Sequence, residues 1–190
     1  ILAGQNFSAT ITGDTSLSQR PMNRIADPLR LMGVQVQTAE GGTPPFSVVG
    51  NGSTQPIDYV LPMASAQVKS CLLLAGMYAD GETKISEPAP CRDHTERMLN
   101  GFGYKVQKEG AIASLSGGGS LKGGKIDVPS DISSAAFFMV AAAITPGADL
   151  EIQHVGLNPT RIGVVNILRE MGADLTIQNE REVGGEPVGD

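Results

Sequence analysis

Three stretches of the chain share one plan, and they decide the fold. They read TITGDTSLSQRPMNRIADPLRLMGVQV (10–36), KISEPAPCRDHTERMLNGFGYKV (84–106) and EIQHVGLNPTRIGVVNILREMGADL (151–175). Each predicts a short strand, a turn, an arginine, a helix, a closing glycine and a second strand. The period of about 70 residues is longer than that of common solenoid repeats, so it favours a pseudo-symmetric globular lobe.

A second repeated element lies between these stretches. SAQVKSCLLLAGMYADGETKI (65–85) matches SSAAFFMVAAAITPGADLEI (133–152), and both predict an apolar helix of about four turns, a turn and a strand. The opening of the chain resembles the tail of another such helix, and no closing strand is expected after Gly184. We therefore expect the chain to be a fragment that is cut at both ends.

Both helices of this second element are apolar on nearly all sides, which is typical of helices in the centre of a domain. Asp93 and Glu96 match a capping box at the start of another helix. Gly33, Gly103 and Gly172 follow their helices, where a left-handed residue is needed. The predicted fold class is therefore α/β (α+β): a pseudo-threefold repeat of βαβαββ units with buried helices and outer sheets.

The composition excludes several classes of protein. The chain has 190 residues, 41% of them hydrophobic, with a net charge of −6, so disorder of the whole chain is excluded. Fourteen Lys and Arg against 20 Asp and Glu disfavour a partner nucleic acid, and no stretch is long and apolar enough to predict a membrane partner. Cys71 and Cys91 have no metal-ligand spacing, so we expect no metal, and a reducing cytoplasm is the expected compartment.

The candidate site consists of groups at helix N-termini. Ser65, Ala66 and Gln67 begin one predicted helix, Arg92 precedes a second and Arg20 precedes a third. Helix N-termini offer free N–H groups and partial positive charge, and guanidinium groups match phosphate or carboxylate, so this set predicts binding of a small anion.

Each of these residues also has a purely structural interpretation. Ser65 could serve only as an N-cap, and Gln67 could be a solvated residue of the first turn. Arg20 could pair with Asp14 or Asp27, and Arg92 with Asp93 or Glu96, as surface ion pairs of little energetic value. Lys69 is expected to face solvent.

Five motifs together resemble the 5-enolpyruvylshikimate-3-phosphate synthase family, in order and over nearly the whole chain. They are GDTSLSQRPM with RIADPLRLMG, PMASAQVKSCLLLAGMYADGET, RDHTERML, DISSAAFFMVAAAI and GLNPTR. The resemblance implies transfer of the enolpyruvyl group of phosphoenolpyruvate to the 5-hydroxyl of shikimate 3-phosphate, with release of phosphate. This reaction belongs to the shikimate pathway of aromatic amino acid biosynthesis, and it implies no cofactor.

The resemblance also implies the roles of individual residues. Ser65, Ala66, Gln67 and Arg92 match residues that bind shikimate 3-phosphate, and Arg20 and Gln67 match residues that bind phosphoenolpyruvate. The family's catalytic residues would lie outside this chain, so the chain alone is expected to have no turnover. Its partner would be the second lobe of the same enzyme.

The resemblance divides the chain into parts. Residues 1–170 would form the first lobe, truncated at its start, with repeats at about 1–50, 51–122 and 123–170. Residues 171–190 would form a crossover or hinge towards the second lobe.

The residues alone do not exclude two alternative functions. One is the sister enzyme that transfers enolpyruvyl to UDP-N-acetylglucosamine. Thr15 stands where that enzyme's loop has a cysteine, and RDHTERML favours the shikimate enzyme. The other rival is a non-catalytic anion-binding lobe.

Overall fold

A computed structural model describes residues 1–190, and their contacts divide them into two compact units. Unit 1 comprises residues 1–91 and 104–120, and unit 2 comprises residues 92–103 and 121–190. Residues 121–170 and 171–190 thus belong to the same unit, and the assignment of 1–170 to a first lobe and 171–190 to a hinge stays a prediction. No helix is both long enough and apolar enough to cross a membrane.

The predicted repeat of βαβαββ modules is confirmed by the order of the elements. The central module is complete and consists of β4 (Asp58–Val60), α2 (Ala66–Gly76), β5 (Glu82–Ser86), α3 (His94–Gly101), β6 (Gln107–Glu109) and β7 (Ile112–Ser116). The first module has its last four elements: β1 (Ser8–Ile11), α1 (Asn23–Leu31), β2 (Gln35–Gln37) and β3 (Phe46–Val49). The third has α4 (Ile132–Ile144), β8 (Val155–Gly156), α5 (Gly163–Glu170), β9 (Arg181–Val183) and β10 (Glu186–Gly189). Three short 3-10 helices, η1 (Leu2–Gly4), η2 (Leu17–Gln19) and η3 (Glu40–Gly42), complete the first module.

The three sheets have the same topology, which confirms that the sequence repeat is a structural repeat. Their strand orders are β1-β3-β2, β5-β7-β6 and β8-β10-β9, with every neighbouring pair antiparallel. In the central module β4 adds a fourth strand, parallel to β5. β10 pairs with both β8 and β9, so the expectation of no strand after Gly184 is wrong.

The closing glycines have the predicted conformation. Gly33, Gly103 and Gly172 have φ values of 78°, 77° and 90°, and each follows the last residues of its helix. A side chain at such φ values is strained, which is why the repeat retains glycine there.

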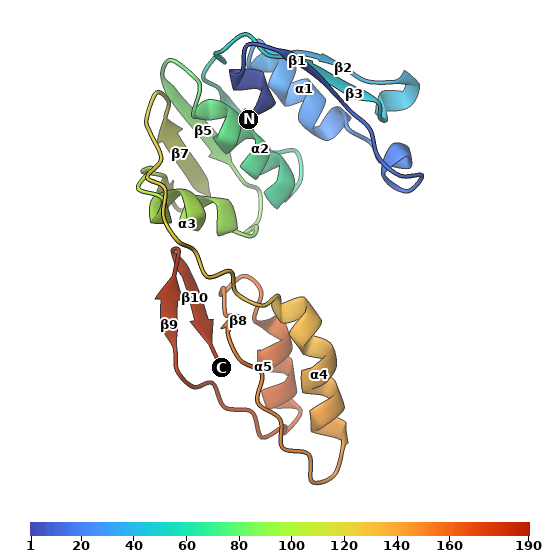
Figure 1. Ribbon diagram of the computed structural model, residues 1–190, viewed down its shortest axis with the longest axis vertical. Helices are drawn as coiled ribbons and strands as arrows, with labels where there is room; N and C mark the ends of the chain where they lie inside the picture. The colour runs from blue at the N-terminus through green and yellow to red at the C-terminus, as the bar shows by residue number, and fades with distance from the viewer. The chain divides into compact units, whose positions relative to one another are not determined.

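The prediction that both apolar helices are buried holds for α2 and is wrong for α4. In unit 1, α2 packs against α1, β5 and β7 (Figure 1). Its residues Leu72 and Leu73 are fully buried. In unit 2, α4 packs against α5 and β8 through Ile132 and Ala135, whereas Phe137 and Phe138 are exposed. Periodicity shows that a helix is apolar on all sides, but it does not show which neighbours cover each side.

The predicted capping box at the start of α3 is also wrong. Asp93 is the N-cap residue of α3, but its side chain makes no capping hydrogen bond. Its carboxylate pairs with Arg97, at 3.0 Å, and accepts a hydrogen bond from Asn158, at 2.7 Å. A charged partner and an amide partner therefore replace the local backbone contact.

Candidate functional site

The start of α2 lies at the carboxyl end of two parallel strands. β4 leads into α2 and α2 leads into β5, which pairs with β4 in parallel. In such a βαβ unit the helix runs antiparallel to the strands, so its N-terminus lies at the edge where both strands end. Ligands of α/β sheets bind at this edge.

Ser65 is the N-cap residue of α2, as its sequence predicted. Its hydroxyl accepts the N–H of Val68 at 3.4 Å, which is a long capping bond. Ser65 and Ala66 are half-buried, and Gln67 is exposed. The first N–H groups of a helix have no acceptor within the helix, and the first turn of α2 contains no acidic residue that would neutralise its partial positive charge. This helix start is therefore suited to an anion.

Arg20 lies in unit 1, directly after η2, in an extended conformation and exposed to solvent. The ion pairs that the structural interpretation expected for it do not form. Asp27 pairs instead with Arg30, at 2.7 Å, and the carboxylate of Asp14 accepts the N–H of Leu17, at 2.7 Å. The guanidinium group of Arg20 thus stays available for a ligand.

Arg92 is exposed in unit 2, and its charge acts on the carboxylate of Asp131. Asp93 pairs with Arg97 rather than with its neighbour in sequence. The structure describes Ser65, Gln67 and Arg20 within one unit and Arg92 within the other.

The third arginine of the repeat behaves differently. Arg161 donates to the carboxylate of Asp131, at 3.0 Å, and to the hydroxyl of Ser133. Asp131 in turn caps α4, because its carboxylate accepts the N–H of Ser133 at 3.0 Å. This hydrogen bond from Ser133, with help from the charges of Arg161 and Arg92, outweighs the small effect of burial and lowers the pKa of Asp131. A carboxylate from the chain itself therefore occupies this helix start.

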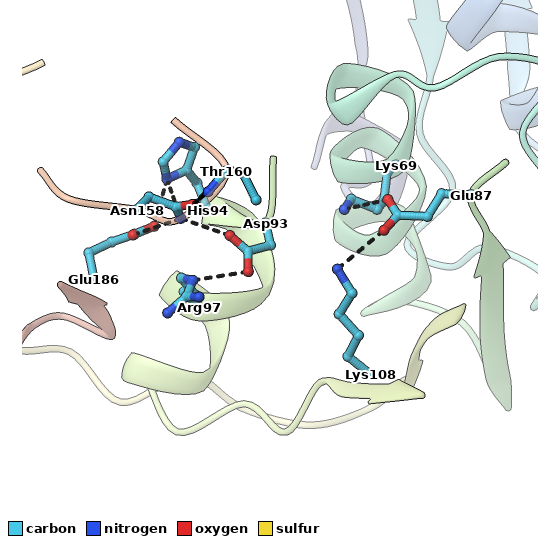
Figure 2. Close-up of polar contacts among 9 residues, drawn as sticks. All are labelled: Lys69, Glu87, Asp93, His94, Arg97, Lys108, Asn158, Thr160 and Glu186. Atoms are coloured by element: carbon cyan, nitrogen blue, oxygen red, sulfur yellow. Dashed lines mark hydrogen bonds and ion pairs between the residues drawn. The ribbon is translucent and has the colours of Figure 1, made fainter. Parts of the chain in front are cut away.

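Behind the first turn of α2 lies a buried ion pair that sequence reasoning missed. Lys69 was expected to face solvent, but its side chain is 0% exposed, and its Nζ lies 2.9 Å from Oε2 of Glu87. Lys108 approaches the other carboxylate oxygen at 3.2 Å (Figure 2). Burial alone would raise the pKa of Glu87, but the hydrogen bonds from the two lysines outweigh burial and lower it. The only sequence signal for this burial was the position of Lys69, between Val68 and the apolar residues that begin at Cys71.

Unit 2 contains a second polar cluster that the sequence did not predict. Asn158 is 2% exposed, and its Nδ2 donates to Asp93, at 2.7 Å, and to Glu186, at 3.0 Å. Its Oδ1 accepts hydrogen bonds from the backbone and the hydroxyl of Thr160, at 2.9 and 2.6 Å (Figure 2). Glu186 also contacts Nδ1 of His94, at 2.6 Å. Asn158 thus joins α3, the segment before α5, and β10.

One cavity of unit 2 is separate from the predicted site residues. It has a volume of about 610 Å³ and lies among residues of α4, α5 and the segments that follow them, such as Met139, Val165 and Ile177. No residue of the predicted set lines it. Cys71 and Cys91 are both free.

Comparison with known proteins identifies the family. The model of the EPSP synthase family (3-phosphoshikimate 1-carboxyvinyltransferase) matches residues 1–188. The chain belongs to the EPSP synthase family. The family assignment confirms the resemblance seen in the five sequence motifs. It favours the shikimate enzyme over the rival UDP-N-acetylglucosamine enzyme.

Relatives within the EPSP synthase family are similar over the whole chain. The 3-phosphoshikimate 1-carboxyvinyltransferases of Alkalilimnicola ehrlichii and Methylococcus capsulatus are 63% and 60% identical over 190 residues. An EPSP synthase structure from Acinetobacter baumannii matches with a TM-score of 0.92 at 63% identity, which confirms the fold class. The chain spans 43% of the A. ehrlichii and A. baumannii proteins and 44% of the M. capsulatus protein, less than half of each.

Proposed function

We propose that this chain contributes substrate-binding groups to the transfer of the enolpyruvyl group from phosphoenolpyruvate to the 5-hydroxyl of shikimate 3-phosphate, which releases phosphate. The observation that carries the proposal is the unneutralised start of α2, at the edge where β4 and β5 end. Membership of the EPSP synthase family supports the same reaction, and the names of the relatives state it.

Each predicted residue has a role in the proposal. The hydroxyl of Ser65 and the first N–H groups of α2, including that of Ala66, bind the phosphate of shikimate 3-phosphate, and Arg92 binds the same substrate. Arg20 binds phosphoenolpyruvate, and the amide of Gln67 contacts both substrates. Two anionic substrates repel each other, so cationic groups and a helix N-terminus lower the free energy of bringing them together.

The internal repeat supports the anion preference of α2. Each of the two apolar helices is preceded by an N-cap residue, which is Asp131 in α4 and Ser65 in α2. In α4 the carboxylate of Asp131 binds the helix start and pairs with Arg161. In α2 the N-cap residue is Ser65, whose hydroxyl is neutral, and the first turn contains no acidic residue, so the same kind of helix start has no carboxylate. We infer that a phosphate group from the substrate takes that place.

The experiment is an NMR titration of the chain with shikimate 3-phosphate, with shikimate as the ligand that lacks the phosphate. The proposal predicts that the amide shifts concentrate at residues 65–68 and near Arg20 and Arg92, and that shikimate causes much smaller shifts. Ser65→Ala is expected to weaken binding several-fold, since one hydrogen bond to a charged group is lost. Arg24→Gln, which removes an exposed arginine of α1, is the matched control. Shifts elsewhere, or none up to millimolar ligand, contradict the proposal.

We infer further that the complete reaction needs the length that the relatives have beyond this chain, including a second lobe, and that it takes place in the cytoplasm. The supporting facts are the share of the relatives that the chain spans and the family to which it belongs. A phosphate-release assay that shows turnover by the 190-residue chain alone would contradict the first of these inferences.

A further inference from the structure

The buried pair of Lys69 and Glu87 links the start of α2 to the end of β5. Lys69 lies one helical turn after Ser65, and Glu87 directly follows β5. Their side chains are 0% and 4% exposed, and the Nζ–Oε2 distance is 2.9 Å. The backbone of Glu87 is fixed as well, because its N–H donates to the carbonyl of Ala111 at 2.9 Å. A rigid sheet edge thus holds one end of the pair.

Cys91 extends this contact towards the helix start itself. Its side chain is buried, and its thiol donates to the carbonyl of Ala89 at 3.6 Å. The charge of Glu87 and the backbone of Ser65 both influence the pKa of this thiol. Burial, with the hydrogen bond to Glu87 and the negative charge of that residue, raises the pKa of the Cys91 thiol, so the thiol stays protonated at neutral pH. Segment 87–91 therefore packs behind the same helix turn that presents Ser65.

A buried carboxylate beside a phosphate-binding helix start is unfavourable unless its charge is neutralised. Here Lys69 and Lys108 both contact Glu87, so the three side chains together carry one positive charge. Ion pairs with this degree of burial seldom increase stability over apolar residues of similar volume, and fixed geometry is one attested benefit of them. The direction of the Lys69–Glu87 contact, from helix to strand end, fixes the orientation of the first turn of α2.

We propose that Lys69 and Glu87 are positioning residues for the phosphate site at Ser65. They do not contact the substrate in this proposal. They hold the first turn of α2 against the end of β5, so that the Ser65 hydroxyl and the adjacent N–H groups keep the orientation that binds phosphate. The inference rests on the proposed function of this helix start.

Glu87→Gln separates positioning from simple charge effects, because the two predict opposite signs. Removal of a negative charge near an anion site strengthens anion binding if only charge matters. Loss of positioning weakens it, and we expect the Kd for shikimate 3-phosphate to rise about tenfold, the size of effect produced by loss of outer hydrogen-bond partners in metal sites. Glu82→Gln is the matched control, because Glu82 pairs with Lys84 on the same strand at 3.1 Å with both side chains about half exposed. Its Kd is expected to stay within about twofold of wild type.

Ligand-free NMR spectra give a second readout. If the pair positions the helix, Glu87→Gln moves the amide signals of residues 65–68, more than 15 positions away in sequence, whereas Glu82→Gln leaves them in place. If Glu87→Gln fails to fold, Lys69→Met/Glu87→Leu replaces the pair by apolar groups and is expected to fold but to bind weakly. Equal or tighter binding by Glu87→Gln, or by the double variant, overturns the positioning role. If the wild-type chain binds no shikimate 3-phosphate, the proposed function fails, and the ligand-free amide signals alone decide whether the pair positions the helix.

Discussion

Substitution Asn158→Asp should destabilise unit 2 strongly at neutral pH and much less in mild acid. Asn158 donates through one nitrogen to two carboxylates, those of Asp93 and Glu186, at 2.7 and 3.0 Å. The substitution keeps the shape of the side chain but replaces this donor with a third carboxyl group. At distances of about 3 Å, a third carboxylate at position 158, which is 2% exposed, cannot stay charged beside the other two.

The magnitude follows from the proton that the new carboxyl group must take up. A group with an ordinary pKa of about 3.9 costs about 4 kcal/mol to protonate at pH 7, at about 1.36 kcal/mol per pH unit. Even when protonated, the group donates one hydrogen bond where the amide donated two. The lost bond to a charged acceptor adds about 1.5–3 kcal/mol. The expected total is therefore about 5–7 kcal/mol at pH 7.

The pH dependence has a definite sign. The pKa of the new carboxyl group is raised in the folded state, so the folded state binds a proton that the unfolded state has lost. The loss of stability therefore grows as the pH rises above about 4 and shrinks by about 1.4 kcal/mol for each pH unit on acidification. Between pH 7 and pH 5 the difference between variant and wild type should fall by about 2.7 kcal/mol.

Urea unfolding at pH 7 and pH 5, followed by signals of unit 2 residues, measures this difference. Asn158→Leu is the uncharged comparison, and its cost should be the same at both pH values. Asn166→Asp, at an exposed position of α5, should change stability by less than about 0.5 kcal/mol. A cost of Asn158→Asp that is below about 1 kcal/mol, or that is equal at the two pH values, would refute the view that Asn158 joins these carboxylates.

Three further predictions concern other parts of the chain. The pKa of Glu87 lies below its ordinary value of 4.5, so its ion pair stabilises the fold above pH 4.5. This stabilisation is lost as the pH falls through the lowered pKa. Acid unfolding of Glu87→Gln should therefore show a shallower loss of stability below pH 4.5 than that of wild type. Ser65→Asp places a carboxylate at the N-cap position where α4 has Asp131, so it should weaken binding of shikimate 3-phosphate about tenfold in a calorimetric titration, while Ser65→Asn, which has the shape of Asp without its charge, should weaken it far less. Gly117→Ala brings a Cβ atom to 2.0 Å from the carbonyl oxygen of Ala79 and should destabilise unit 1 by about 1–3 kcal/mol in urea unfolding, whereas Gly123→Ala, in open space, should have little effect.

The repeat was predictable from the sequence because it depends on local signals. Each module needs a helix that ends at a left-handed glycine and strands on either side, and Gly33, Gly103 and Gly172 have the backbone conformation that their spacing implied. The identical strand orders of the three sheets then follow from repeating the same local units. The helix starts indicated which residues could bind an anion, but the substrate that each one binds in our proposal came from the resemblance, and no local signal distinguishes Arg20 from an arginine in a surface ion pair.

The predictions that failed depended on partners far away in the sequence. Lys69 can be buried because its Nζ donates a hydrogen bond to the carboxylate of Glu87, 18 residues later. The carboxylate of Asp93 does not cap its own helix and instead accepts a hydrogen bond from Asn158, 65 residues later. The exposure of Phe137 and Phe138 depends on what packs beside α4, and the composition of a helix contains no information about its neighbours. A buried polar group is visible in sequence only when its partner is also local.

Differences between the repeats indicate function more strongly than their similarities do. The three arginines occupy the same place in their modules, so the fold alone would predict equal environments. Arg161 is held by Asp131 and Ser133, which completes a charge balance within the chain. Arg20 has no such carboxylate, although Asp14 and Asp27 lie near it in sequence, and Arg92 acts on Asp131 only through its charge. We infer that a repeat which satisfies one arginine internally and leaves Arg20 and Arg92 exposed, in a chain with net charge −6, keeps these two cationic groups for an anionic ligand.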